Sequence, residues 1–366
     1  MKKKLFLCLL AAAAVSFTAC QKDEVLNEVQ QDNAIGFGTY VGRDAQTKAT
    51  SINDATSLQN ASATNGFGVF AYYTENDTWN DQLDEPFIPN FMNNINVKYS
   101  GGWTYSPLRY WPKSGNDVIS FLAYYPYKEG TVLKSDIEDD VTTYSTKIDF
   151  RLNDDIKKQV DLMYHNNYAN TINLNNGVNN PVEAVSFNFA HALSRIGFKV
   201  TTGAETNTNT TITINTVTLK FKNTEQKGIH TLGELDIKTG NWIVNDNNRV
   251  AKDFVWSTTP GTNEGSFVET NYVTVGGSID QLNHDNSYLM IPPVNDAKYQ
   301  ITVNYSVKTD GDGIATVNNT FTSSENEIDL LSGKAYTFVL NIGLTAISFD
   351  ATVSDWPTPS ETVDVE

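Results

Sequence analysis

Apolar and polar residues alternate with a period of two along most of this 366-residue chain. The clearest case is AYTFVLNIGLTAISFDATVSDW near the C-terminus, where Tyr336, Phe338, Leu340 and Ile342 alternate with smaller or polar residues. Successive side chains of a strand point to opposite faces, so this pattern predicts half-buried β-strands. Similar runs are GFGVFAYY, VISFLAYYPY, VSFNF, RIGFKVTT, TITINTVTLKF, SYLMIPP and YQITVNYSV.

Turn residues bound these runs, and helical periodicity is scarce. The run VDLMYH at 160–165 favours at most a single helical turn. Many short strands separated by turn signals favour an all-β chain folded as antiparallel sandwiches. The length suits two domains, and the Asn-rich stretch 166–184 suggests a boundary near residue 180. We therefore expect one domain over 34–180 and a second over 181–366.

The N-terminus has the three-part layout of a secretory signal peptide. Three lysines precede an apolar run from Leu5 to Val15, which is too short to span a bilayer, and small residues lead to Cys20. A cleavage site ending directly in cysteine resembles the lipobox of bacterial lipoproteins, although Phe17 stands where an aliphatic residue is usual. We expect a signal peptide over 1–19, an acylated Cys20 and a linker over 20–33. The alternative is an ordinary signal peptide with an incidental cysteine.

Charged residues follow Cys20 immediately. Lys22, Asp23 and Glu24 resemble the export signal that sends Bacteroidota-type lipoproteins to the outer leaflet, which predicts an outer-membrane lipoprotein at the cell surface. The formal net charge is −17, which argues against nucleic acid as a partner because phosphate binding needs clustered Lys and Arg. We expect membrane contact through the lipid alone.

No catalytic or metal-binding pattern stands out. The histidines at 165, 191, 230 and 284 lack the spacing of a zinc site, and neither a phosphate-binding loop nor a nucleophile elbow is present. We expect His191, within FAHALSRIGF, to be a structural residue. The sequence therefore predicts a protein that is not an enzyme, with no cofactor, no metal and no catalytic residues.

Several phrases occur together in the order found in one known family. They are YWP at 110–112, ISFLAYYPY, DLMYH, FNFAHALSRIGFKV, YLMIPP, LLSGKAYTFVLNIG and VSDW. In this order they resemble the fimbrillin-like proteins, the type V pilins of Bacteroidota, from about residue 34 to 356. The resemblance implies a lipoprotein made of two transthyretin-like antiparallel β-sandwich domains in tandem. It also implies a subunit of surface fimbriae with a role in adhesion.

The resemblance further implies a mode of assembly. In this family a trypsin-like protease cuts after the first strand, and the C-terminal strand of the next subunit fills the vacated place. The partners would be other pilin subunits in a head-to-tail polymer, with a host or bacterial surface receptor left open. After processing the subunit would reside in the fimbrium.

The sequence offers residues for each part of this device. AIGFGTYVG, with Ile35, Phe37 and Val41 on one face, is the candidate removable strand. The following RDAQTKATS carries Arg43 and Lys48. Arginine is the family's usual cleavage residue, whereas Lys48 sits where relatives often have an arginine, and the alternative is that both are solvated loop charges.

The candidate donor strand lies at the other end of the chain. Ile347, Phe349, Ala351 and Val353 form an apolar ladder suited to a groove with alternating pockets. The alternative is an ordinary last strand that stays in its own domain.

A different function stays open beside assembly. A surface lipoprotein that binds a glycan or host ligand without polymerising would use exposed aromatic side chains as stacking platforms. The candidates are Trp79, Trp103, Trp111, Tyr72, Tyr73, Tyr105 and Tyr110. Such residues more often pack within or between sheets.

Overall fold

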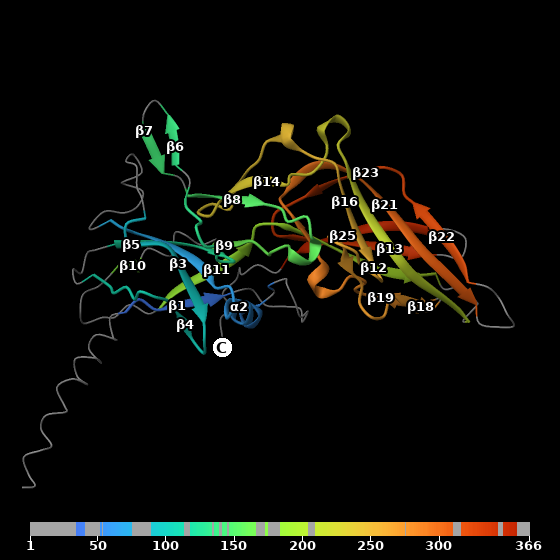
Figure 1. Cartoon of the computed structure of the whole chain (residues 1–366), viewed down its shortest axis with the longest axis horizontal. Coiled ribbons are helices and arrows are strands. Elements are labelled where there is room, and N and C mark those ends of the chain that lie inside the picture. Colours follow the sequence, from blue (N-terminus) through green and yellow to red (C-terminus); the bar gives the residue numbers. More distant parts are fainter. Residues whose placement is uncertain are drawn as a thin grey trace, which may run out of the picture.

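The computed structural model of the chain is mostly β-structure arranged in several sheets (Figure 1). It describes residues 34–40, 52, 54–74, 89–112, 118–133, 135–138, 141–144, 146–165, 173–174, 184–203, 209–274, 276–309, 316–342 and 347–356. The expectation of a β-rich chain is thus confirmed. VDLMYH is not helical, because its second half forms the strand Met163–His165; the described α-helix is α2 (Ala55–Ser62), capped by Asp54.

The first sheet has the strand order β1-β11-β9-β5-β2-β3-β4, with β10 also paired to β5. Its strands are β1 (Phe37–Tyr40), β2 (Phe67–Tyr73), β3 (Met92–Tyr99), β4 (Trp103–Thr104), β5 (Val118–Tyr125), β9 (Met163–His165), β10 (Asn173–Leu174) and β11 (Val185–His191). Strand β5 is buried along its whole length, and β2 nearly so. A continuous apolar run is what a strand covered on both faces requires, and separate apolar clusters do lie against this sheet.

Two further sheets pack face to face in the second half of the chain. One has the order β19-β12-β24-β25, with β20 paired to β12; the other has the order β17-β16-β13-β21-β22, with β18 on β13 and β23 on β21. The first contains β12 (Ser194–Thr202), β19 (Ser278–Ile279), β20 (Leu289–Ile291), β24 (Lys334–Ile342) and β25 (Ile347–Asp355). The second contains β13 (Thr210–Lys222), β16 (Lys252–Ser257), β17 (Gly265–Ser266), β18 (Tyr272–Thr274), β21 (Val294–Thr309), β22 (Val317–Thr322) and β23 (Asn326–Leu330).

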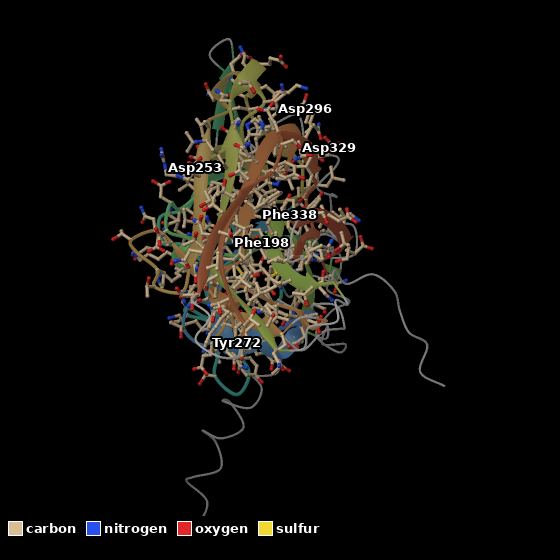
Figure 2. All side chains as sticks on the ribbon, turned by 90° about the vertical axis from the view of Figure 1, so that its right-hand side faces the viewer. Phe198, Asp253, Tyr272, Asp296, Asp329 and Phe338 are labelled. Atoms are coloured by element: carbon tan, nitrogen blue, oxygen red, sulfur yellow. The ribbon has the colours of Figure 1, made fainter. Side chains whose placement is uncertain are left out.

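Alternating side chains fill the space between these two sheets. Phe198 and Phe338 stack with ring centroids 5.9 Å apart and lie near the middle of the view in Figure 2, whereas Asp253, Asp296 and Asp329 lie nearer its outline. In β13 the side chains that face the core have even numbers up to Ile214 and odd numbers from Val217 onward. The change occurs because a β-bulge interrupts the pairing with β21 there. The alternation in the sequence therefore specifies the core face, with one interruption.

A third apolar cluster joins the two halves. It combines Phe70 and Leu122 of the first sheet with Leu235, Met290 and Ala335 from the second half. The small sheet β15-β14-β8 bridges the halves in the same way, because β8 (Lys147–Arg151) pairs with β14 (Leu232–Asp236), which also pairs with β15 (Trp242–Ile243). The hairpin β6 (Ser135–Glu138) and β7 (Val141–Tyr144) and the 3₁₀ turns η2 (Ile156–Lys158), η4 (Thr224–Gln226), η5 (Asp246–Asn248) and η6 (Asp285–Ser287) complete the described elements.

The proposed domain boundary near residue 180 lies outside the described residues. The first described strand after it, β11, belongs to the first sheet, and the second half's sheets begin with β12 at Ser194. The chain therefore changes sheets after His191. The division into two domains stays a prediction.

Among the described strands, strand direction departs from the antiparallel expectation at three places. β1 pairs parallel to β11, β12 parallel to β24, and β16 parallel to β17. Alternation fixes which side chains face the core but carries no information about strand direction, so the sequence pattern could not predict these pairings.

Candidate functional site

The first described strand lies at the edge of its sheet. β1 is last in the strand order and pairs with β11 through the register Phe37 to Val185 and Gly38 to Ser186. The amide of Val185 donates to the carbonyl of Gly36 at 2.9 Å. Among the described residues no second strand pairs with Phe37–Tyr40 on the other side. An edge strand of four residues adds few ladder hydrogen bonds and can be removed without cutting the sheet.

A loop holds the beginning of this strand on its other side. The amide of Ile35 donates to the carbonyl of Arg109 at 2.9 Å, and the hydroxyl of Tyr105 donates to the carbonyl of Ile35 at 2.9 Å. Burial raises the pKa of Tyr105, and the hydrogen bond with the Arg109 backbone opposes the rise. The hydroxyl therefore stays protonated at neutral pH and remains a donor to the strand.

Ile35 and Phe37 fill the apolar interior beside the sheet. Ile35 is 1% exposed and Phe37 6% exposed. The ring of Phe37 lies 5.1 Å from that of Tyr105 and 5.5 Å from that of Phe187, with Phe67 and Phe121 within 6.4 Å of it. We call these four rings the Phe37 pocket. Its walls belong to β2, β5, β11 and the loop before Tyr110, so they remain if β1 leaves.

The other N-terminal residues singled out by the sequence lie outside the described residues. They are Cys20, Val41, Arg43 and Lys48. After the segment that carries both basic residues, Ile52 is again described and is buried. The proposed roles of the four residues therefore stay predictions.

The last strand also lies at an edge, in the sheet β19-β12-β24-β25. β25 pairs antiparallel with β24, and the register places Ile347 opposite Ile342 and Phe349 opposite Leu340. Ala351 is partly buried against the core between the sheets, whereas Val353 is 55% exposed. The strand therefore lies in its own sheet, and its apolar ladder is not fully covered there.

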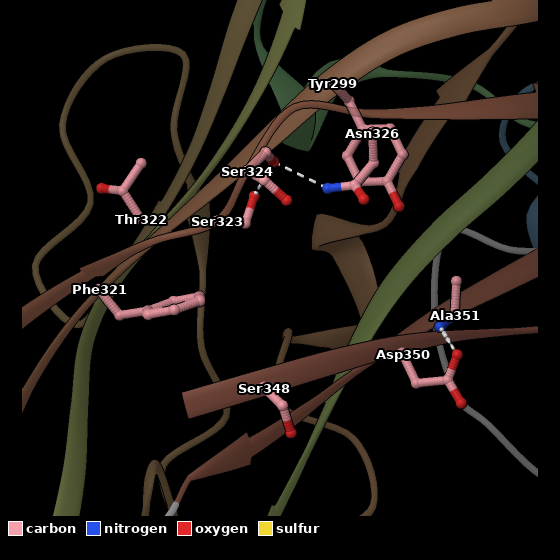
Figure 3. Close-up of a pocket in the computed structure, with 9 residues that line it drawn as sticks. All are labelled: Tyr299, Phe321, Thr322, Ser323, Ser324, Asn326, Ser348, Asp350 and Ala351. Carbon is pink, nitrogen blue, oxygen red and sulfur yellow. Dashed lines mark hydrogen bonds between the residues drawn. The ribbon is translucent and has the colours of Figure 1, made fainter. Parts of the chain in front are cut away.

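A groove runs beside this strand (Figure 3). It has a volume of about 450 Å³. Figure 3 shows Ser348, Asp350 and Ala351 of β25 across it from side chains of β21, β22, the following turn and the start of β23. Those side chains are Tyr299, Phe321, Thr322, Ser323, Ser324 and Asn326. The hydroxyl of the buried Ser323 already donates to the carbonyl of Ser324 and accepts from the amide of Ile301. The groove thus separates the edges of two sheets.

The end of the last strand is pinned by a buried aromatic residue. Trp356 is fully buried and stacks on His191, with ring centroids 3.9 Å apart. His191 Nδ1 lies 2.9 Å from Asp161 Oδ1, and the other oxygen of Asp161 accepts the amide hydrogen of Ile52 at 2.9 Å. Burial lowers the pKa of the nearby Arg195, opposed by Tyr288 and Asp161. His191 is structural, as expected; its partners lie far away in the sequence, so no local pattern indicated them.

The aromatic residues considered for ligand stacking are mostly packed. Tyr72 and Trp111 are buried, and Trp103 is partly buried against the apolar cluster that contains Phe67. Tyr110 is 45% exposed. Trp79 lies outside the described residues, and the half-exposed Tyr73 and Tyr105 also pack on that cluster. The described aromatics thus do not form a broad exposed platform.

Other types of site are scarce in the described part of the chain. No group of three or more His, Cys, Asp or Glu side chains is arranged to hold a metal ion there. None of the described helices has the length and apolar character needed to cross a bilayer.

Three comparisons with known proteins bear on this arrangement. A family model described as fimbrillin-like matches residues 47–356. The fimbrium subunit Fim1C of Phocaeicola vulgatus is 26% identical over 379 aligned residues, which cover 95% of this chain and 94% of that protein. The crystal structure of a fimbrial protein from Bacteroides vulgatus has a TM-score of 0.62 at 20% identity, over 88% of this chain and 99% of that one. The last likeness shows a shared fold.

Proposed function

The chain belongs to the fimbrillin-like family, and on that premise we propose that it is a structural or accessory subunit of cell-surface fimbriae, assembled by proteolysis-triggered strand exchange. The family is structural and non-enzymatic, in agreement with the sequence. The fold expected with this role is a tandem of two transthyretin-like sandwiches. Its partners would be further pilin subunits, as the name of the Phocaeicola relative suggests.

One observation supports this proposal most strongly: β1 lies at the edge of its sheet, and Ile35 and Phe37 of this segment nevertheless fill the interior. Burying Ile35 and Phe37 contributes roughly 1.5–3 kcal/mol each relative to exposure. Loss of the strand would leave an apolar slot beside unpaired backbone groups of β11, which is a template for another strand. The last strand, also at an edge, is a segment that can leave its sheet without splitting it.

Cleavage would act as the switch. While β1 is attached to the chain, it competes for the slot as an intramolecular partner at high effective concentration. A cut after Arg43 or Lys48 abolishes this advantage, so a strand from a neighbouring subunit can then take the place. Because the contact joins different surfaces head to tail, repetition gives a filament.

We assign the N-terminal segment an anchoring role before that step. Acylation of Cys20 would tether the precursor to the outer membrane, and cleavage would release the subunit from its lipid. The same cut would thus free the subunit and open its acceptor slot.

Limited trypsin digestion tests the proposal. The wild-type chain, the single variants R43A and K48A and the double variant are digested, and the products are followed by size-exclusion chromatography and N-terminal sequencing. We expect oligomers that start at Asp44 or Ala49 from the wild type, and monomer that keeps residues 34–41 from the double variant. Trimmed wild-type protein that stays monomeric would contradict the proposal and would favour a non-polymerising surface lipoprotein.

A further inference from the structure

The first and last strands of this chain carry the same short sequence pattern. Residues 34–41 read AIGFGTYV and residues 346–353 read AISFDATV, so Ala, Ile, Phe and Val recur at the same spacing. We propose that the last strand of a second copy enters the site of β1 in one fixed register, with Ile347 in the place of Ile35 and Phe349 in the Phe37 pocket. This inference rests on the proposed function and adds the residue register and the direction of the incoming strand.

The direction of the incoming strand follows from the spacing. The three larger shared residues, Ile, Phe and Val, are separated by one and then three residues, an asymmetric arrangement that matches only when both strands are read from N- to C-terminus. β1 runs parallel to β11. The incoming strand would therefore also run parallel to β11, with Ile347 and Phe349 on the face that Ile35 and Phe37 now use.

The positions that differ between the two segments are compatible with the site. Ser348 and Asp350 would replace Gly36 and Gly38. A Cβ atom added at Gly36 would meet Ala184 at 3.4 Å, an ordinary contact, and one added at Gly38 would meet nothing within 4 Å. Neither glycine has a positive φ angle. Larger, polar side chains can therefore occupy both positions, which lie on the outward-facing side of the strand.

The next position favours the incoming strand over the resident one. The hydroxyl of Thr39 is buried and has no hydrogen-bond partner among the described residues. Ala351 would stand in its place and carries no hydroxyl. Since an unsatisfied buried polar group is unfavourable, the substitution removes a defect of the resident strand.

The site of the resident strand covers apolar side chains closely. The sites of Ile35 and Phe37, which the proposal gives to Ile347 and Phe349, are almost closed to solvent. In its own sheet the last strand leaves Val353 55% exposed. The site of Val41 lies outside the described residues. A segment that repeats the resident strand is matched to this slot rather than to an arbitrary one, so a second copy of the same chain is the fitting partner.

Disulfide trapping tests the register. The register places Asp350 where Gly38 now lies, opposite Ser186. The pair S186C and D350C is introduced into the full chain with Cys8 and Cys20 both replaced by serine (C8S and C20S), and the protein is processed with trypsin under mild oxidation. Ser186 and Asp350 of one copy lie in different sheets, so a bond between them reports contact between copies. A pair with S186C and T352C, displaced by two residues, is the matched control.

A third pair shows whether the site accepts a disulfide. G38C with S186C should close within the uncleaved chain, which also reports that the cysteine variants fold. We expect processed S186C/D350C to give covalent oligomers on a non-reducing gel and S186C/T352C to give none.

The outcomes separate the two levels of the proposal. The processed protein can form oligomers under reducing conditions and yet not be trapped by the S186C/D350C pair. If only the S186C/T352C pair traps them, or neither pair does, the register is wrong and strand exchange stands. Processed protein that forms no oligomers would overturn both. F349A gives a second reading without cysteines: it should prevent oligomers of processed protein, whereas F37A should not, because that residue is removed with the strand.

Discussion

Phe37 holds the resident strand through contacts with four aromatic rings contributed by separate segments. We predict that F37A destabilises the uncleaved chain by about 3–5 kcal/mol, because a buried aromatic side chain is lost and a cavity is left. Urea unfolding followed by tryptophan fluorescence measures this. V353A, at a position 55% exposed, should change stability by less than about 0.5 kcal/mol. Equal losses in both variants would mean that the Phe37 pocket does not hold the strand.

His230 should make stability depend on pH. Its side chain is buried, and both burial and the positive charge of Arg249 lower its pKa. The carboxylate of Asp246 has the opposite effect on this pKa, and its Oδ1 lies 3.3 Å from His230 Nε2. Because the folded-state pKa lies below the unfolded one, the folded chain binds fewer protons. The contribution of His230 is therefore complete above the unfolded pKa and is lost as the pH falls through the folded pKa.

The direction of this pH dependence can be measured by urea unfolding. The urea midpoint of the wild type should fall between pH 7.5 and 5, and H230Q should show a smaller fall. The difference between the two chains isolates this residue from other titrating groups. A larger fall in H230Q would contradict the direction of the shift.

At the scale of single elements, alternation predicted where the strands are but not how they pair. It placed Ile35 and Phe37 on one buried face of the first strand, and both side chains are buried. It could not predict that this strand runs parallel to β11, since direction depends on the route of the chain between strands separated by more than 140 residues. The helix α2 was not expected, and its Asp54 cap was the overlooked signal.

The last strand is held in place by the buried Trp356 that follows it as well as by its pairing with β24. Trp356 buries its indole on His191 just beyond β25. We predict that W356A leaves the second half folded but speeds hydrogen exchange of the β25 amides, because an edge strand without its pin opens locally. Hydrogen exchange measured by mass spectrometry on peptides covering 347–355 tests this. Y272A, at an exposed position in another sheet, serves as the control and should leave those peptides unchanged.

At the scale of the whole molecule, contacts distant in sequence connect the two ends. Asp161 binds the amide of Ile52, which follows the segment with Arg43 and Lys48, and also His191, on which Trp356 stacks. Sequence patterns are local, so neither this chain of contacts nor the apolar cluster shared by the halves could be predicted. The family likeness implies the assembly, and the register that we propose for it comes from the repeated pattern in residues 34–41 and 346–353.

Filaments grown from the processed chain offer the most direct measurement. Their structure by electron cryomicroscopy, at a resolution that shows side chains, reveals which strand lies beside β11. We predict density for residues 346–353 of a neighbouring copy, parallel to β11, with Phe349 among the rings of Phe67, Tyr105, Phe121 and Phe187. A slot still occupied by residues 34–40 of the same copy, with β25 paired to its own β24, would contradict strand exchange.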